Sequence, residues 1–97
     1  MQYILTAQDF PDALPRRLEC RQRHLDMHGD LFKEGKMLYA AALMNEKGEM
    51  AGSLIVCEFP DRAALDAYLA VEPYVLGKVW DKIDIRACKV APLYARK

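Results

Sequence analysis

The sequence predicts an α+β domain whose elements follow the order β-α-β-β-α-β. Two segments carry apolar residues at helical spacing, four short segments are rich in apolar and β-branched residues, and turn residues separate them. This order is the split βαβ, or ferredoxin-like, arrangement, in which both helices cover one face of a four-stranded antiparallel sheet. No repeat or linker divides the chain, so we expect a single domain over residues 1–97.

The first part of the chain contains one predicted strand and one long helix. The strand is expected over residues 2–7 and the helix over residues 14–34, where a proline-containing segment leads into the first turn. Apolar residues at helical spacing predict that one stripe of this helix is buried: Leu14, Leu18, Leu25 and Phe32. Gly35 is expected to end the helix, because glycine readily adopts the left-handed conformation found there.

The second part of the chain predicts a hairpin, a second helix and a last strand. Residues 37–44 and 52–59 are the hairpin strands, joined by a polar loop that contains glycine. Asp61 is a predicted N-cap for the second helix. The inward-facing residues of that helix are expected to be Ala64, Leu65, Tyr68 and Leu69. Glu72-Pro73-Tyr74 breaks the helix, a short helical turn reaches Gly77, and a strand is expected over residues 82–90, before a tail from Pro92.

Composition limits the possible partners. Fourteen basic residues balance fourteen acidic ones and no basic tract is present, which argues against nucleic acid and anionic membranes as partners. No segment approaches the roughly 18 apolar residues that would span a bilayer. Cys20, Cys57 and Cys88 are odd in number and widely separated, which is typical of reduced thiols in a cytoplasmic protein.

The two hairpin strands also predict an interface. Both are apolar at nearly every position instead of alternating, and such strands belong to sheets that are buried on both faces. The helices cover only one face. We therefore expect a homodimer in which the open sheet face of one chain packs against that of a second copy.

One pair of residues is the best candidate for chemistry. His24 lies within the long helix, near the border of its predicted buried face, and Glu72 lies at the break after the second helix. A carboxylate bound to one imidazole nitrogen fixes the tautomer, so that the other nitrogen can act as a base. From the residues alone, a half-buried structural histidine and a solvated glutamate are the commoner alternatives.

Three further residues are candidate substrate contacts: Ser53, which follows a glycine at the start of the third strand; Arg21, the arginine nearest the apolar stripe; and Tyr74, which offers a ring and a hydroxyl. The other arginines of the first helix are expected to solvate it. His24 and His28 have the HxxxH spacing of metal ligands, but the glutamate of HExxH is missing and no third ligand is indicated nearby. We therefore expect neither a metal nor a cofactor.

These segments also carry a family resemblance. Over almost its whole length the chain resembles the YCII-related (YciI-like) domain family. The resemblance is carried by YILTAQD at residues 3–9, RQRHL at 21–25, EGKML at 34–38, GSLIVCEF at 52–59 and EPYV at 72–75. It implies a ferredoxin-like α+β chain that pairs as a dimeric α+β barrel, in agreement with the periodicity.

The resemblance also implies an activity. Family members are thought to use a His-Asp pair, and His24 falls on the family histidine. The carboxylate usually belongs to an Asp-Pro-Tyr/Phe motif, where this chain has Glu72, whereas His28 matches no family histidine. One branch is associated with dehydrochlorination of a chlorinated hydroxyhydroquinone, and similar folds act on small cyclic or aromatic molecules.

Together these points predict a cofactor-independent enzyme of lyase or isomerase type, with His24 as general base and Glu72 as its orienting carboxylate. The enzyme would move a proton on a small cyclic or aromatic molecule. The alternative is a non-catalytic dimeric module that binds a small metabolite or a partner protein.

Overall fold

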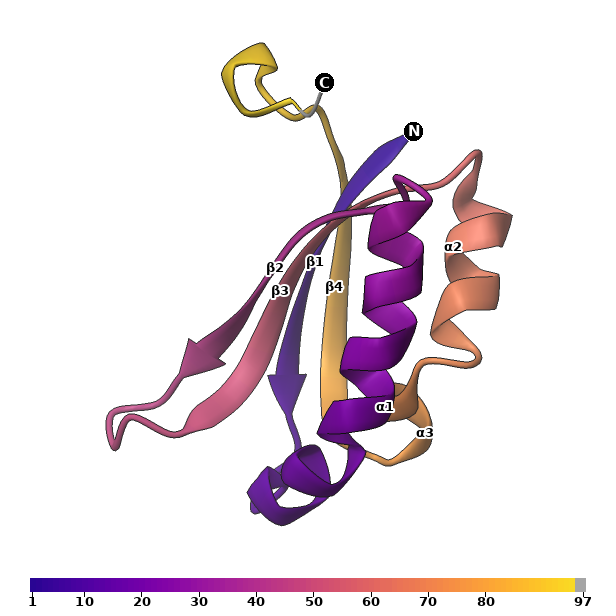
Figure 1. The fold of residues 1–97 in the computed structure, drawn as a ribbon. Helices are drawn as coiled ribbons and strands as arrows, with labels where there is room; N and C mark the ends of the chain where they lie inside the picture. Colours follow the sequence, from indigo (N-terminus) through magenta and orange to yellow (C-terminus); the bar gives the residue numbers. More distant parts are fainter. Residues whose placement is uncertain (96–97) are drawn as a thin grey trace.

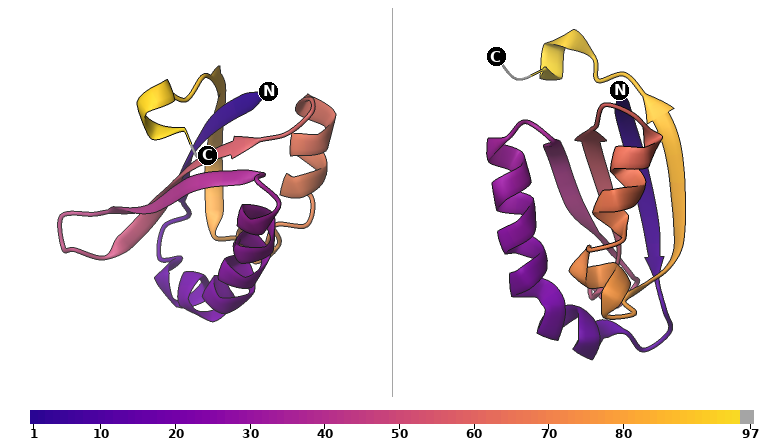
Figure 2. Two further views of the ribbon diagram at one scale, coloured as in Figure 1. Left: turned by 45° about the horizontal axis from the view of Figure 1, so that its top comes forward. Right: turned by 90° about the vertical axis from the view of Figure 1, so that its right-hand side faces the viewer.

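The computed structural model describes residues 1–95 and has the predicted order of elements (Figure 1). They are β1 (Gln2–Asp9), α1 (Leu14–Lys33), β2 (Met37–Met44), β3 (Met50–Glu58), α2 (Arg62–Leu69), α3 (Pro73–Leu76) and β4 (Trp80–Cys88), followed by a 3-10 turn at Pro92–Tyr94. The strands form one antiparallel sheet in the order β2-β3-β1-β4. Both long helices lie on the same face of this sheet (Figures 1 and 2). The ferredoxin-like class is therefore confirmed, although the last two residues of the predicted domain 1–97 lie outside the described residues.

Two of the predicted helix boundaries have the expected local cause. The side chain of Asp61 accepts a hydrogen bond of 2.9 Å from the backbone N–H of Ala64, so Asp61 caps α2 as predicted. Gly35 follows α1 with φ of +77°. β1 runs two residues further than predicted, to Asp9, and β4 begins two residues earlier, at Trp80. The cause is that Asp9 pairs with Trp80 beyond an irregularity in the register.

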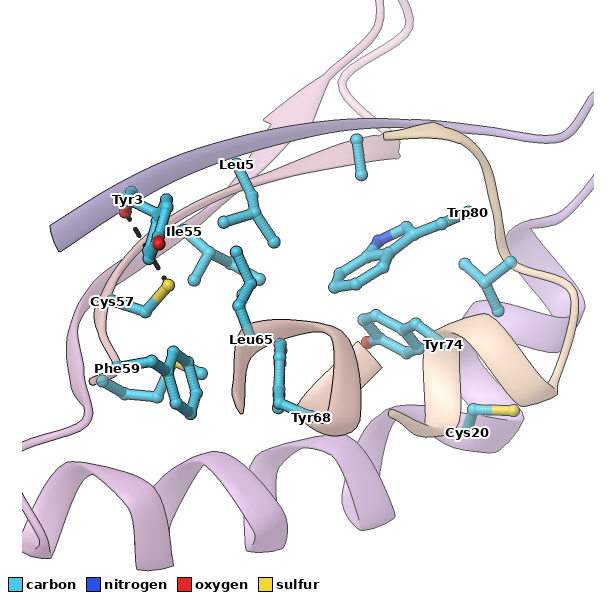
Figure 3. Close-up of a cluster of buried hydrophobic side chains, with 13 residues drawn as sticks. Tyr3, Leu5, Cys20, Ile55, Cys57, Phe59, Leu65, Tyr68, Tyr74 and Trp80 are labelled. Carbon is cyan, nitrogen blue, oxygen red and sulfur yellow. Dashed lines mark hydrogen bonds between the residues drawn. The ribbon is translucent and has the colours of Figure 1, made fainter. Parts of the chain in front are cut away.

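The core lies between the sheet and the two helices. Alternate residues of β1 face the helices, and the antiparallel register brings Leu5 opposite Ile55 and Tyr3 opposite Cys57 on the same face. Leu65 of α2 and Trp80 at the start of β4 complete this layer (Figure 3). The core therefore ends, toward α3, in aromatic residues beside the polar groups described below.

The buried face of α1 differs from the predicted apolar stripe. Leu18, Leu25 and Phe32 are 55%, 43% and 46% exposed, and this part of the prediction is wrong. The buried residues are instead Arg17, Cys20, His24 and His28, which also recur every three or four positions. Polar side chains are found inside a protein when they have hydrogen-bond partners there, and the buried polar residues of this set have such partners. α1 therefore buries a row of mostly polar side chains and leaves Leu18 and Leu25 exposed.

Among residues 1–95, no element covers the face of the sheet opposite the helices (Figure 2). The β2–β3 hairpin extends away from the helices (Figures 1 and 2). Tyr39, Leu43 and Met44 of β2 are exposed. The homodimer expected to cover this face remains a prediction. Within residues 1–95 there is no helix that could span a membrane, and the three cysteines are free.

Replacing Gly52 by alanine is expected to destabilise the sheet next to the site. A Cβ at this position would lie 2.5 Å from the backbone oxygen of Ala7 on β1, too close for van der Waals contact. We expect Gly52→Ala to lower the free energy of unfolding by about 1–3 kcal/mol, the range seen for overpacking. Chemical denaturation measures this change. Gly29→Ala is the matched control, because outside its chain neighbours and the adjacent backbone of its own helix no atom lies within 4 Å of its added Cβ, and it should leave stability unchanged or raise it by up to about 1 kcal/mol.

Candidate active site

Glu72 is the centre of a buried polar cluster. It is the N-cap of α3, where its side chain accepts a hydrogen bond of 3.1 Å from the backbone N–H of Tyr74. Pro73 suits the first position of α3 because that position needs no donor. The side chain of Glu72 is 0% exposed. The break after α2 therefore places a carboxylate inside the protein, facing α1.

Four donors converge on the two oxygens of Glu72. His24 Nδ1 lies 2.6 Å from Oε1, which also accepts from the Tyr74 backbone. His28 Nε2 lies 2.8 Å from Oε2, which also accepts from the Tyr68 hydroxyl at 2.6 Å. Because an ionised carboxylate can only accept, the hydrogen must be on Nδ1 of His24 and on Nε2 of His28.

This assignment leaves Nε2 of His24 as an acceptor. None of the hydrogen bonds found among the described residues uses this atom, yet no buried side-chain nitrogen or oxygen among them lacks a partner. Nε2 therefore keeps some accessible surface, and His24 lines the pocket described below. The ring is held in place by Tyr74, which stacks on it with centroids 3.9 Å apart and planes 12° apart. The geometry is that of an oriented imidazole with one free nitrogen.

The cluster favours a charged Glu72 and a neutral His24. Burial opposes the charge of Glu72, but the hydrogen bonds from His24, His28 and Tyr68 and the charge of His24 outweigh it and lower its pKa to about 2. Burial lowers the pKa of His24, and Glu72 compensates for only part of that effect. Burial and the charge of Glu72 raise the pKa of Tyr68. At neutral pH the site therefore holds an ionised carboxylate, a neutral imidazole and a protonated phenol.

A second buried network lies beside the first. Arg17 binds Asp9 through two hydrogen bonds of 2.7 and 2.8 Å and donates a third, of 2.9 Å, to Ser53 Oγ. Trp80 Nε1 donates to the same oxygen at 3.1 Å. Burial opposes the charge of Arg17, but the hydrogen bond and charge of Asp9 outweigh it and raise its pKa. The prediction that Arg17 solvates the helix is therefore wrong, since this residue is 2% exposed.

Both networks border one pocket of about 190 Å³ between α1 and the β2–β3 hairpin. Arg21, His24, Ser53 and Tyr74 line it, together with Arg17 and the alanines of β2. Glu72 lies behind His24 and not in the wall. The structure thus brings every predicted site residue into one region, while their roles in binding or catalysis remain predictions.

Sequence reasoning assigned no place in these networks to five of their residues: Asp9, Arg17, His28, Tyr68 and Trp80. One signal was available, because His24 and His28 have the i, i+4 spacing that places side chains on the same side of a helix. The argument that no third metal ligand lies near the two histidines is also wrong, since their donor atoms and one from Glu72 lie within 4.8 Å of one another. These atoms already hydrogen-bond to each other, and a cation would have to displace both ring protons. We therefore interpret the cluster as a hydrogen-bonded acid–base network.

Replacing His28 by glutamine is expected to raise the pKa of His24. The two rings lie with centroids 4.0 Å apart, and a charge on His28 disfavours a charge on His24. The glutamine amide retains a donor for Glu72 but does not titrate. An NMR titration of the His24 ring measures the change, with exposed Gln22→Ala as a control that leaves it unaltered. A fall in the pKa of His24 would contradict this view of the cluster.

The fold and the site define a small ferredoxin-like α+β protein with a buried histidine–glutamate cluster beside a pocket. The chain belongs to the YCII-related domain family, whose model matches residues 1–89. Protein YciI of Escherichia coli O6:H1 is 32% identical over 95 residues, which cover 92% of this chain and 97% of that protein.

Solved structures with the same fold are more distant in sequence. TftG, the 5-chloro-2-hydroxyhydroquinone dehydrochlorinase of Burkholderia phenoliruptrix, was solved in complex with 2,5-dihydroxybenzoquinone; it matches with a TM-score of 0.82 at 16% identity, over 92% of this chain and 94% of that one. An antibiotic biosynthesis monooxygenase matches with a TM-score of 0.55 at 18% identity, over 94% and 98% of the two chains. At these identities the likeness is one of fold.

Proposed function

We propose that this protein is a cofactor-independent enzyme that moves a proton on a small cyclic or aromatic molecule. The observation that carries the proposal is the 2.6 Å contact between His24 Nδ1 and Glu72, which leaves Nε2 facing the pocket. Such a pair needs no bound group to act as a base near neutral pH. In the predicted alternative, a non-catalytic binding module, nothing requires these two residues to meet. Their contact and burial favour the enzyme.

The chemical steps follow from this arrangement. His24 Nε2 accepts a proton from a C–H or O–H group of the substrate, and Glu72 stabilises the imidazolium that forms. His24 then returns the proton to another atom of the substrate or to a leaving group. Ser53, Arg21 and Tyr74 are the proposed substrate contacts, since all three line the pocket.

The comparisons support the proposed class of substrate. TftG is named as a dehydrochlorinase, and its structure was solved with a ring compound. The other similar protein is named as a monooxygenase. Both names describe enzymes that act on small molecules, but neither determines which reaction this chain catalyses.

We also propose that the protein is a homodimer paired through the sheet face that the helices leave open. The exposed apolar residues of β2 and the outward-facing Val56 and Leu54 of β3 support this pairing. Sedimentation velocity at micromolar concentration tests it, and a single monomeric species would contradict it.

Exchange of hydrogen for deuterium tests the proposed chemistry without knowledge of the product. Small enolisable ring compounds are incubated with the protein in D2O, and NMR follows the loss of their C–H signals. For any compound that exchanges, we expect His24→Ala to lower the rate by about a hundredfold or more, while Gln22→Ala, two residues away and exposed, retains it. Full activity of a folded His24→Ala or Glu72→Gln variant would contradict the proposed pair.

A further inference from the structure

The hydrogen bonds of Ser53 leave one donor unused. Its Oγ accepts from Arg17 at 2.9 Å and from Trp80 at 3.1 Å. Arginine and tryptophan N–H groups can only donate, so they occupy both lone pairs of the hydroxyl oxygen. The hydroxyl hydrogen must then be donated elsewhere, and none of the hydrogen bonds found among the described residues uses it. Ser53 lines the pocket, which leaves this hydrogen available to a bound molecule.

Arg21 gives the pocket a positive charge. Arg17 is neutralised by Asp9, with which it forms a buried ion pair. Arg21 takes part in none of the ion pairs found within residues 1–95 and lines the same pocket from the next turn of α1. Glu72 lies behind His24, already bound by four donors. The groups that face the bound molecule are therefore a hydroxyl donor, a guanidinium and an imidazole acceptor.

We propose that Ser53 and Arg21 form an oxyanion site and that the substrate is a small molecule with an enolate, phenolate or carboxylate oxygen. This inference rests on the proposed function and deepens it by naming the substrate class. Donors fixed before the reaction stabilise a developing negative charge most effectively when the surrounding protein excludes water. The pocket volume of about 190 Å³ is below the 300 Å³ or so at which drug-sized sites begin, so a single ring fits best.

The site accounts for the whole movement of charge in a proton transfer. His24 Nε2 takes the proton of a C–H bond next to a carbonyl group. The electrons of that bond form a C=C bond, and the electrons of the carbonyl π bond move to oxygen. This oxygen accepts hydrogen bonds from Ser53 and Arg21. Where a second C=C bond is conjugated with this enolate, the proton returns to the far carbon of that bond as the carbonyl group re-forms, which completes an isomerisation with no external oxidant or reductant.

Binding of benzoate and of benzamide tests the proposal, because the two probes have nearly the same shape but differ in charge. Isothermal titration calorimetry on the full chain should give benzoate binding that is about tenfold or more tighter than benzamide binding. Arg21→Gln should abolish that preference, whereas Arg23→Gln, two residues away and outside the pocket, should retain it. Ser53→Ala should weaken benzoate binding and Ser53→Thr, which retains the hydroxyl, should restore it.

His24→Ala separates this inference from the proposed chemistry. A folded His24→Ala variant that still prefers benzoate supports the oxyanion site whether or not turnover is ever detected. Equal binding of the two probes to the wild-type chain, or an unchanged preference in Arg21→Gln, overturns the oxyanion site and leaves His24 as a base untouched. NMR shifts at Ser53 on adding benzoate confirm the location, and shifts confined to other surfaces contradict it.

Discussion

Glu72→Gln should lower the free energy of unfolding by about 2–6 kcal/mol, because two buried donors lose their acceptor at about 1–3 kcal/mol each. The carboxylate receives four donors, two on each oxygen. A glutamine side chain offers one oxygen and an NH2 group, so one pair of donors meets another donor. Either Tyr68 and His28 or His24 and the Tyr74 backbone then lose their acceptor. Chemical denaturation measures the loss, and exposed Glu46→Gln should have little effect.

The same variant should lower the pKa of His24 still further. In the wild-type chain burial lowers this pKa, and the hydrogen bond and charge of Glu72 raise it again in part. Glutamine removes the charge and leaves the burial, so only the lowering effect remains. NMR titration of the imidazole is the measurement. An unchanged pKa in a folded variant would show that the two side chains do not interact in solution.

Acid should remove this stabilisation in two ranges of pH. His24 has a folded-state pKa below 6.5 and Glu72 one of about 2, below 4.5, so at each group the unfolded chain takes up protons first as the pH falls. Stability is therefore complete above about pH 6.5, declines below that value as the unfolded histidine protonates, and declines again from 4.5 toward 2 through Glu72. The second decline should be absent in Glu72→Gln, where no carboxylate titrates at this position.

The sequence predicted the architecture because the strands and turns follow local rules. Asp61 caps a helix and Gly35 ends one for reasons contained in single residues. The orientation of α1 was not predictable in this way. Leu18 and Leu25 form a stripe at helical spacing, but Cys20, His24 and His28 form another, and hydropathy favours the first.

Residues far away in the sequence determine which of the two faces of α1 is buried. His28 is buried because Glu72 and Tyr68, 44 and 40 residues away, provide its partners. His24 and Glu72 were singled out from the sequence and also fall on the family motifs, whereas no sequence signal placed Tyr68 or His28 in contact with Glu72. The unused hydrogen of Ser53 could not be predicted from the sequence either, because it depends on two donors, Arg17 of α1 and Trp80 of β4, that only the fold brings to the hydroxyl.

Arg17→Met should destabilise the protein by about 3–5 kcal/mol, as expected when one member of a buried ion pair is lost. Asp9 would keep its charge, with 5% of its side chain exposed and without its bidentate partner. Chemical denaturation measures the change, and Arg23→Met, at an exposed position of the same helix, is the matched control. A cost no larger than that of the control would show that the pair is not formed in solution.

The double variant Asp9→Leu/Arg17→Met tests whether the ion pair orients Ser53 in addition to stabilising the fold. Buried ion pairs can often be replaced by apolar residues of similar volume without loss of stability, so most of the single-variant cost should be recovered. Its pocket should still be altered, because Ser53 would accept only from Trp80 and could turn its hydrogen away from the bound molecule. We therefore expect a stable protein whose preference for benzoate over benzamide is reduced. Retention of the full preference would mean that the pair serves the fold alone and that Ser53 is oriented without it.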